Sequence, residues 1–154
     1  MTHTPFFRCA TLADLSAIVR MLEDDGLGSQ REKFEDPLPE SYLKAFREID
    51  VNKDHELIVA DMDGEVVGTL HLTFIPSISY QGGLRAQVES VRVDSKLRGK
   101  GIGKQMMVYA IERAKERGAH LMQLTSHETR TDAHRFYEQL GFKKAHVGMK
   151  LNLK

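Results

Sequence analysis

The chain has 154 residues, 41% of them hydrophobic, and its 22 lysines and arginines balance 22 aspartates and glutamates to a formal net charge of +0. This length suits one domain, 1–154, with a real core, and the neutral balance argues against a nucleic-acid binder that works through bulk charge. No apolar run approaches the roughly 18 residues of a membrane span, and the start lacks a signal-peptide core, so we expect no membrane partner and a cytoplasmic location.

The opening strand is predicted at Phe6 to Ala10, and it contains the single cysteine, Cys9. One cysteine cannot form an internal disulfide, which is typical of a reducing cytoplasm. We expect Cys9 to be a buried structural thiol rather than a nucleophile. The seven histidines show no tight ligand spacing, so no metal site is expected.

Two helices are predicted next. The first begins after the cap residues 11–14 and ends at Gly26, and it has apolar residues at helical spacing: Leu15, Ile18, Val19 and Leu22. A loop over 26–39 precedes a second short helix around Tyr42 to Phe46. Residues 22–39 hold six acids against two bases, a local charge of −4, which would attract a cationic ligand unless the loop is simply solvated.

Three strands are predicted in the middle of the chain. Leu57–Ala60 and Val66–Phe74 are joined at Asp63-Gly64, a strong hairpin signal, and a third strand covers Gln87 to Val93. Strict alternation along this third strand would place its residues on two faces, one with Val88 and Ser90 and the other with Glu89, Val91 and Val93.

The stretch RGKGIGK, Arg98 to Lys104, follows directly. It matches neither the dinucleotide-binding pattern G-x-G-x-x-G nor the P-loop pattern G-x-x-x-x-G-K-[ST] in any register. A glycine turn that opens a helix remains, and its unpaired N–H groups favour an anionic, phosphorylated ligand. The window 92–104 holds five cations and one acid, a local charge of +4, although a solvated charged turn would share this composition.

The rest of the chain predicts a helix from Ile102 to Gly118, a strand at Leu121–Thr125, a second helix that stops at Gly141, and a final strand at Val147–Leu153. The second helix carries apolar residues at i, i+3, i+4 and i+7: Ala133, Phe136, Tyr137 and Leu140.

Two motifs together resemble the GNAT superfamily of acetyl-CoA-dependent N-acetyltransferases. They are Arg98-x-x-Gly101-x-Gly103 after a strand, and FYEQLGF, residues 136–142, about 35 residues later. Residues 132–137 resemble small-molecule members, including aminoalkylphosphonate acetyltransferases. The resemblance implies an α/β (α+β) GNAT fold, a mixed and mostly antiparallel sheet of about seven strands flanked by about four helices and splayed at the coenzyme A cleft.

The resemblance also implies a binding site for acetyl-CoA. Backbone groups of the third strand would hold the pantetheine arm, the N–H of Val91 would face the thioester oxygen, and the glycine turn would hold the pyrophosphate. The family often has Asn where this chain has Arg130, which leaves that contact open. The implied residues are Val91, Arg92, Val93, Arg98, Gly99, Lys100, Gly101, Ile102, Gly103, Lys104 and Arg130.

The acetyl transfer that the resemblance implies needs a general acid and a general base. Tyr137 matches the tyrosine that the family places near the thioester sulfur as general acid. A lysine-like amine must lose a proton before it attacks, and Glu89 is the preferred acceptor of that proton, while a surface salt bridge is its ordinary alternative. His71 is a competing base, and Asp132 and His134 are weaker candidates.

We therefore predict an N-acetyltransferase that acts on a primary amine of a small molecule by direct attack in a ternary complex. The alternatives are a non-catalytic module of the same fold that senses acyl-CoA or regulates transcription, and a nucleic-acid protein, which the neutral charge disfavours. The C-terminal strand suggests a homodimer, because edge strands of GNAT sheets often pair between subunits.

Overall fold

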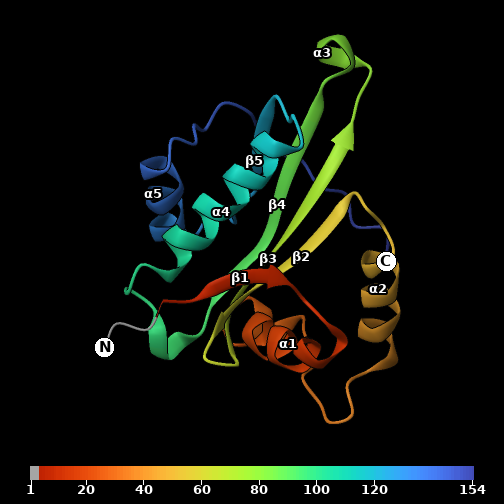
Figure 1. Ribbon diagram of the computed structural model, residues 1–154, viewed down its shortest axis with the longest axis vertical. Coiled ribbons are helices and arrows are strands. Elements are labelled where there is room, and N and C mark those ends of the chain that lie inside the picture. Colours follow the sequence, from red (N-terminus) through yellow and green to blue (C-terminus); the bar gives the residue numbers. More distant parts are fainter. Residues whose placement is uncertain (1–3) are drawn as a thin grey trace.

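The computed structural model describes residues 4–154 and contains a five-stranded sheet in the order β1-β2-β3-β4-β5 (Figure 1). The first four strands pair antiparallel, and β5 pairs parallel with β4. This mixed, mostly antiparallel sheet confirms the predicted fold class, with five strands rather than about seven. The strands are β1 Phe6–Cys9, β2 His55–Met62, β3 Glu65–Pro76, β4 Leu84–Val93 and β5 Leu121–Leu124.

The helices pack on two faces of this sheet. In β2, Ile58 and Ala60 join the apolar cluster that contains α4, whereas Val59 between them joins the cluster that contains α1 and α2. The sheet therefore separates an α4 face from an α1/α2 face, as the period of two along a strand requires. The helices are α1 Leu15–Glu23, α2 Glu40–Asp50, α3 Ser79–Gly82, α4 Ile102–Glu116 and α5 Thr131–Gln139.

The long β3–β4 hairpin extends past the other strands and carries α3 at its tip (Figure 1). Within the described part of the chain, residues 4–154, no helix is both long enough and apolar enough to span a membrane.

A bulge in β4 makes the expected alternation wrong. The β3–β4 register shifts between Thr69 and His71, and Ser90 has a positive φ of 55°. Val88 lies in the α4-face cluster, and Val91 and Val93 pack against the same cluster, so they share a face despite their odd spacing from Val88. An extra residue in one strand shifts every later side chain by one position, which sequence periodicity cannot show.

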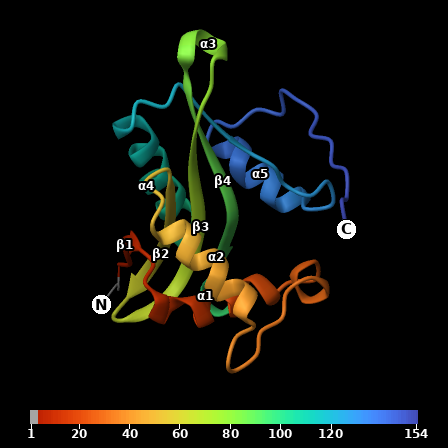
Figure 2. The ribbon, with the colours of Figure 1, turned by 90° about the vertical axis from the view of Figure 1, so that its right-hand side faces the viewer.

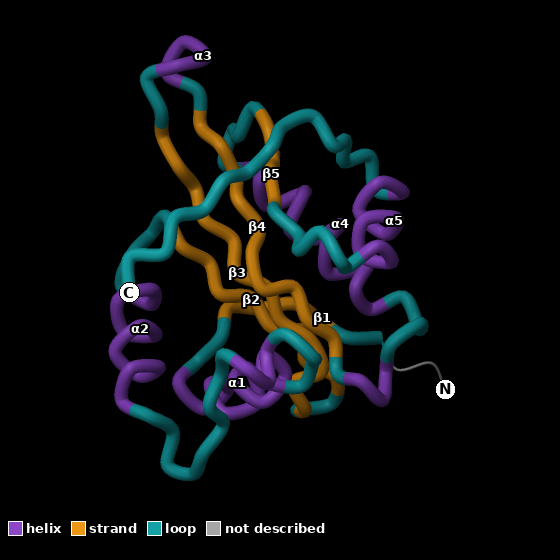
Figure 3. The backbone as a smooth tube through the Cα atoms, turned by 180° about the vertical axis from the view of Figure 1, so that it is seen from behind, coloured by secondary structure: helices purple, strands orange, loops and turns teal. Residues whose placement is uncertain are grey.

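The predicted final strand is also wrong. Residues 143–154 form neither helix nor strand, and Figure 2 shows this segment running away from the sheet. Its alternate apolar side chains are almost fully exposed: Val147 at 89%, Met149 at 93%, Leu151 at 84% and Leu153 at 89%. A strand needs a neighbour to accept and donate its backbone hydrogen bonds. Within residues 4–154 this segment joins no strand, as the tube in Figure 3 shows.

Cys9 is exposed, not buried as expected. It ends β1, which pairs with β2 and forms one edge of the sheet, so the strand is covered less completely than its apolar composition suggests.

Candidate active site

The strands β4 and β5 separate halfway along β4. Their parallel pairing runs from Arg85 opposite Leu121 to Val88 opposite Leu124 and ends there. Among residues 4–154, no strand pairs with this side of β4 from Glu89 to Val93. The backbone groups along this part of β4 are therefore open to an extended ligand that bonds as a further strand would.

The glycine turn lies at the end of the same strand. Gly99 and Gly101 have positive φ values of 78° and 85°, and Gly101 is the residue that precedes the first turn of α4. Glycine adopts this conformation without the steric cost that a Cβ adds. The exposed turn therefore presents the N-terminus of a 15-residue helix, where N–H groups without helical partners favour an anion.

Three predicted site regions meet at the start of α4. A Cβ placed on Gly103 would lie 3.6 Å from both the Phe136 ring of α5 and a methyl carbon of Val93. The Arg98 side chain reaches back, with Nε donating to the carbonyl oxygen of Val93 at 3.4 Å. The turn, the end of β4 and α5 thus enclose one site.

Tyr137 lies beside this junction, half-buried on α5. Its ring contacts Phe136 and Phe142, with centroids 5.1 and 5.9 Å away. Burial raises the pKa of its phenol, and the nearby cations Arg92 and Arg130 act in the opposite direction. The phenol therefore keeps its proton at neutral pH and can donate it or share it in a hydrogen bond.

A carboxylate from the α1–α2 loop closes one side of the site. Oδ2 of Asp25 lies 3.1 Å from Nε of Arg92 on β4 and 3.2 Å from Nη2 of Arg130 before α5. Burial of Asp25 opposes its ionisation, but the N–H of Gly28 and the two guanidinium groups outweigh burial and lower its pKa. Asp25 is therefore charged and fixes both arginines.

The α1/α2 face carries the two candidate bases. Glu89 is paired with His71 across β3 and β4, so both side chains project from this face, and Glu89 also accepts a hydrogen bond from the Gln87 amide. Glu89 is exposed, whereas His71 is half-buried, with Nε2 2.9 Å from Nδ1 of His55. Burial, followed by the charge of His55, lowers the pKa of His71, which is therefore neutral at pH 7.

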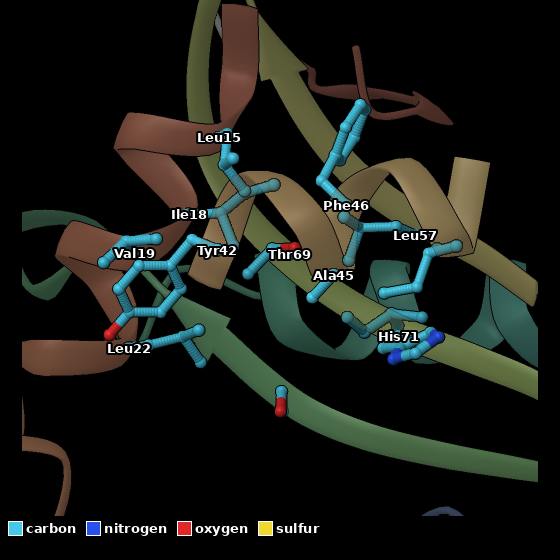
Figure 4. A pocket seen from close by; sticks show the side chains of 13 residues that line it. Leu15, Ile18, Val19, Leu22, Tyr42, Ala45, Phe46, Leu57, Thr69 and His71 are labelled. Atoms are coloured by element: carbon cyan, nitrogen blue, oxygen red, sulfur yellow. The ribbon is translucent and has the colours of Figure 1, made fainter. Parts of the chain in front are cut away.

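A cavity of about 140 Å³ lies on the same face, between α1, α2 and the sheet (Figure 4). His71 and Ser90 line it together with residues of both helices. The bulge residue Ser90 thus faces the cavity and directly precedes Val91, whose N–H is the expected oxyanion donor.

The weaker candidates are engaged elsewhere. Nε2 of His134 lies 2.9 Å from the carbonyl oxygen of His127, and Asp132 pairs with Arg135 at 3.3 Å on the exposed side of α5. Among residues 4–154, no three His, Cys, Asp or Glu side chains are grouped to hold a metal ion.

Residues 23–142 match the sequence model of the "Acetyltransferase (GNAT) family". The chain belongs to this family. An aminoalkylphosphonate N-acetyltransferase of Salmonella typhimurium is 35% identical over 101 residues, which cover 64% of this GNAT chain and 62% of the relative. The matched part is thus less than two thirds of that relative's length.

Two solved structures resemble the whole GNAT chain. A protein from Bacillus halodurans C-125, described as a transcriptional regulator, is 54% identical, with 97% of this chain and 99% of that chain covered and a TM-score of 0.95. A predicted acetyltransferase from Clostridium acetobutylicum with acetyl-CoA is 21% identical, with 97% and 96% covered and a TM-score of 0.75, and it shares the fold.

Sequence analysis of this GNAT chain missed three features of the site. Asp25 lies in an acidic loop, and nothing in its spacing indicates that it pairs with arginines far along the chain. The bulge at Ser90 and the cavity arise from tertiary packing. Four of the six loop acids have side-chain partners in the chain: Glu23 with the Phe34 N–H, Asp25 with the arginines, Glu32 with Arg31 and Tyr42, and Glu35 with Lys33.

Proposed function

We propose that this protein transfers the acetyl group of acetyl-CoA to a primary amine of a small molecule, by direct attack in a ternary complex. One observation carries the proposal: beyond the last β5 pair, the end of β4 at Val93 lies beside the start of α4 and beside Phe136, whose ring contacts Tyr137. A thioester with a pyrophosphate tail requires three parts in its binding site. These are a turn that binds the anion, an extended backbone edge and a proton donor.

In this proposal the N–H groups of the glycine turn, residues 98–104, bind the pyrophosphate, with charge added by Arg98, Lys100 and Lys104. The backbone of Val91, Arg92 and Val93 bonds the pantetheine arm, and the Val91 N–H faces the thioester oxygen. Arg130 stands where the family often has Asn. Its ion pair with Asp25 supports an indirect role, in which it positions Asp25 and Arg92.

The amine nitrogen attacks the thioester carbon, the carbon–sulfur bond breaks, and the coenzyme A thiolate takes a proton from Tyr137. The protonated amine must lose one proton before it attacks, which costs about 4.6 kcal/mol for a lysine-like amine at neutral pH. After the attack the nitrogen loses a second proton, which replaces the one that Tyr137 gives to the thiolate. Glu89 takes the first proton directly or through water, because its exposed carboxylate lies on the α1/α2 face, where we place the amine substrate. His71 on the same face is the alternative base.

Thiol release from acetyl-CoA over a panel of amines tests the proposal, with the acetylated product identified by mass spectrometry. The expected result is amine-dependent thiol release that Glu89→Gln reduces and that Asp132→Asn, an exposed carboxylate of α5, leaves unchanged. Absence of acetyl-CoA binding in calorimetry would refute the proposal outright.

A second candidate is a regulator on the same fold that binds acyl-CoA without turnover. The observation in its favour is the description of the 54% identical Bacillus halodurans structure as a transcriptional regulator. It is less well supported, because it gives no role to Tyr137 beside the open edge. Bound acetyl-CoA without turnover on any amine, and without an effect of Tyr137→Phe, would favour it.

We further propose a homodimer in the cytoplasm. The exposed apolar segment 143–154 and the free edge of the sheet at β5 belong to the same chain, so each could complete the other in a second copy. The cytoplasmic location rests on the single thiol, which needs no oxidising compartment.

A further inference from the structure

The cavity on the α1/α2 face has an apolar wall from α1, α2 and the sheet (Figure 4). Among the described residues, 4–154, those that line it include no Lys, Arg, Asp or Glu. Its apolar wall is formed mainly by Ile18, Val19 and Leu22 of α1, Phe46 and Ile49 of α2, and Leu57 of β2.

Three of the four polar side chains in the wall, those of Tyr42, Thr69 and His71, already have partners in the protein, and Ser90 is the fourth. The Thr69 hydroxyl donates to the Ile58 carbonyl oxygen at 3.0 Å, and His71 contacts His55 at 2.9 Å. The Tyr42 hydroxyl accepts from the Lys33 N–H at 2.8 Å and lies 3.1 Å from a carboxylate oxygen of Glu32. A charged group in the cavity would lose its water and gain little in return.

The cavity borders the strand position next to the proposed reaction site. Ser90 lines the cavity, and the next residue, Val91, carries the N–H expected at the thioester oxygen. Consecutive Cα atoms are about 3.8 Å apart. A substituent one or two bonds from the attacking amine can therefore enter the cavity while the nitrogen reaches the thioester carbon.

The two cations beside Tyr137, Arg92 and Arg130, lie outside the cavity wall. Both bind Asp25. The relative from Salmonella typhimurium is described as acting on aminoalkylphosphonates, whose anion needs cations that are not neutralised. The cavity of this chain offers an apolar surface instead.

We propose that this cavity receives a compact apolar group of the acceptor, so that the preferred substrates are primary amines with an aromatic ring or a branched aliphatic chain. The volume of about 140 Å³ matches this class, since an apolar cavity of about 150 Å³ holds one benzene molecule. The inference rests on the proposed function, because it names the acceptor class of that same site.

Two variants of α2 test the inference. Ala45→Leu adds three carbons to a side chain that faces the cavity (Figure 4). Ser41→Leu adds an apolar side chain to the same helix at an exposed position outside the cavity and is the matched control. Thiol release is measured with phenethylamine, isoamylamine, ethylamine and aminoethylphosphonate, and binding of para-fluorophenethylamine is followed by fluorine NMR in the presence of coenzyme A.

We expect phenethylamine and isoamylamine to have higher kcat/KM than ethylamine and aminoethylphosphonate. Ala45→Leu should raise the KM for phenethylamine by about 10-fold or more, in line with the effect of one or a few methylene groups in an apolar pocket. Ser41→Leu should leave this KM unchanged, and neither variant should alter acetyl-CoA affinity.

The outcomes separate the inference from the proposed function. A preference for aminoethylphosphonate, or equal effects of the two variants, would overturn the inference while the acetyltransferase function stands. Fluorine NMR binding that Ala45→Leu abolishes, without turnover of any amine, would support the cavity's ligand class and overturn the function. No binding and no turnover would overturn both.

Discussion

Asp25 and Arg92 form an ion pair across the site, with Oδ2 and Nε 3.1 Å apart, although 66 residues lie between them in the chain. Arg130 shares the same carboxylate oxygen at 3.2 Å, so one acid from the α1–α2 loop holds a strand and a helix start together. The three side chains are mostly shielded from water, at 16%, 14% and 30% exposure. Asp25 therefore links the α1–α2 loop mechanically to the proposed coenzyme A site.

Asp25→Asn tests this link. It removes the charge that two guanidinium groups face, so we expect the free energy of unfolding to fall by about 2 kcal/mol, the scale of a hydrogen bond to a charged group. The loop next to the acceptor should loosen and raise the KM for the amine. Asp24→Asn is the control, because Asp24 is exposed and binds Arg98 only through its backbone oxygen. Equal urea denaturation curves for the two variants would contradict the role of Asp25.

Tyr137→Phe removes the proposed proton donor and keeps the ring that packs on Phe136 and Phe142. We expect kcat to fall about 100-fold, the lower range for general acid catalysis, with unchanged affinity for acetyl-CoA in calorimetry. Tyr109→Phe serves as control, since Tyr109 packs against Phe7 on the opposite part of α4. A Tyr137→Phe enzyme of normal kcat would remove Tyr137 from the mechanism.

Gly101→Ala probes the turn. With φ at 85°, alanine at this position costs roughly 1–2 kcal/mol of stability and displaces the N–H groups at the start of α4. We therefore expect weaker acetyl-CoA binding in calorimetry. Gly26→Ala is the control, because Gly26 has open space around its Cα and no positive φ. If both variants bind acetyl-CoA as well as the wild type, the turn is not the pyrophosphate site.

The glycine turn is also the part of the site that sequence predicts best. Its function depends on residues adjacent in the chain, so the pattern from Gly99 to Gly103 carries both the backbone conformation and the helix start. The bulge at Ser90 and the Asp25–Arg92 pair depend on which segments meet in space. The alternation of residues predicted β4 correctly as a strand but placed Glu89 and Val91 on the same face. The bulge adds one residue to the strand, and the amino-acid pattern does not reveal it.

His71 gives the stability a pH dependence. Burial, and then the nearby His55, lower the pKa of His71, while the charge of Glu89 opposes the shift. In the unfolded chain the pKa of a histidine is about 6.5. Above this pH the imidazole is neutral in both the folded and the unfolded protein, so its full contribution to the free energy of unfolding is present. As the pH falls through that value, the unfolded chain binds the proton first and stability declines. Urea denaturation between neutral pH and pH 5 should show a smaller decline for His71→Asn, and an identical decline would refute this assignment.

The segment 143–154 provides the last test. Four apolar side chains at alternate positions are 84% to 93% exposed, an unfavourable arrangement for a chain on its own, and β5 leaves a sheet edge free. Leu151→Glu places a charge in the middle of this surface and should shift the protein from dimer to monomer in analytical ultracentrifugation. Lys150→Glu changes the charge at the neighbouring position, on the opposite side of an extended chain, and should leave the dimer intact. A wild-type protein that sediments as a monomer at micromolar concentration would rule out the homodimer.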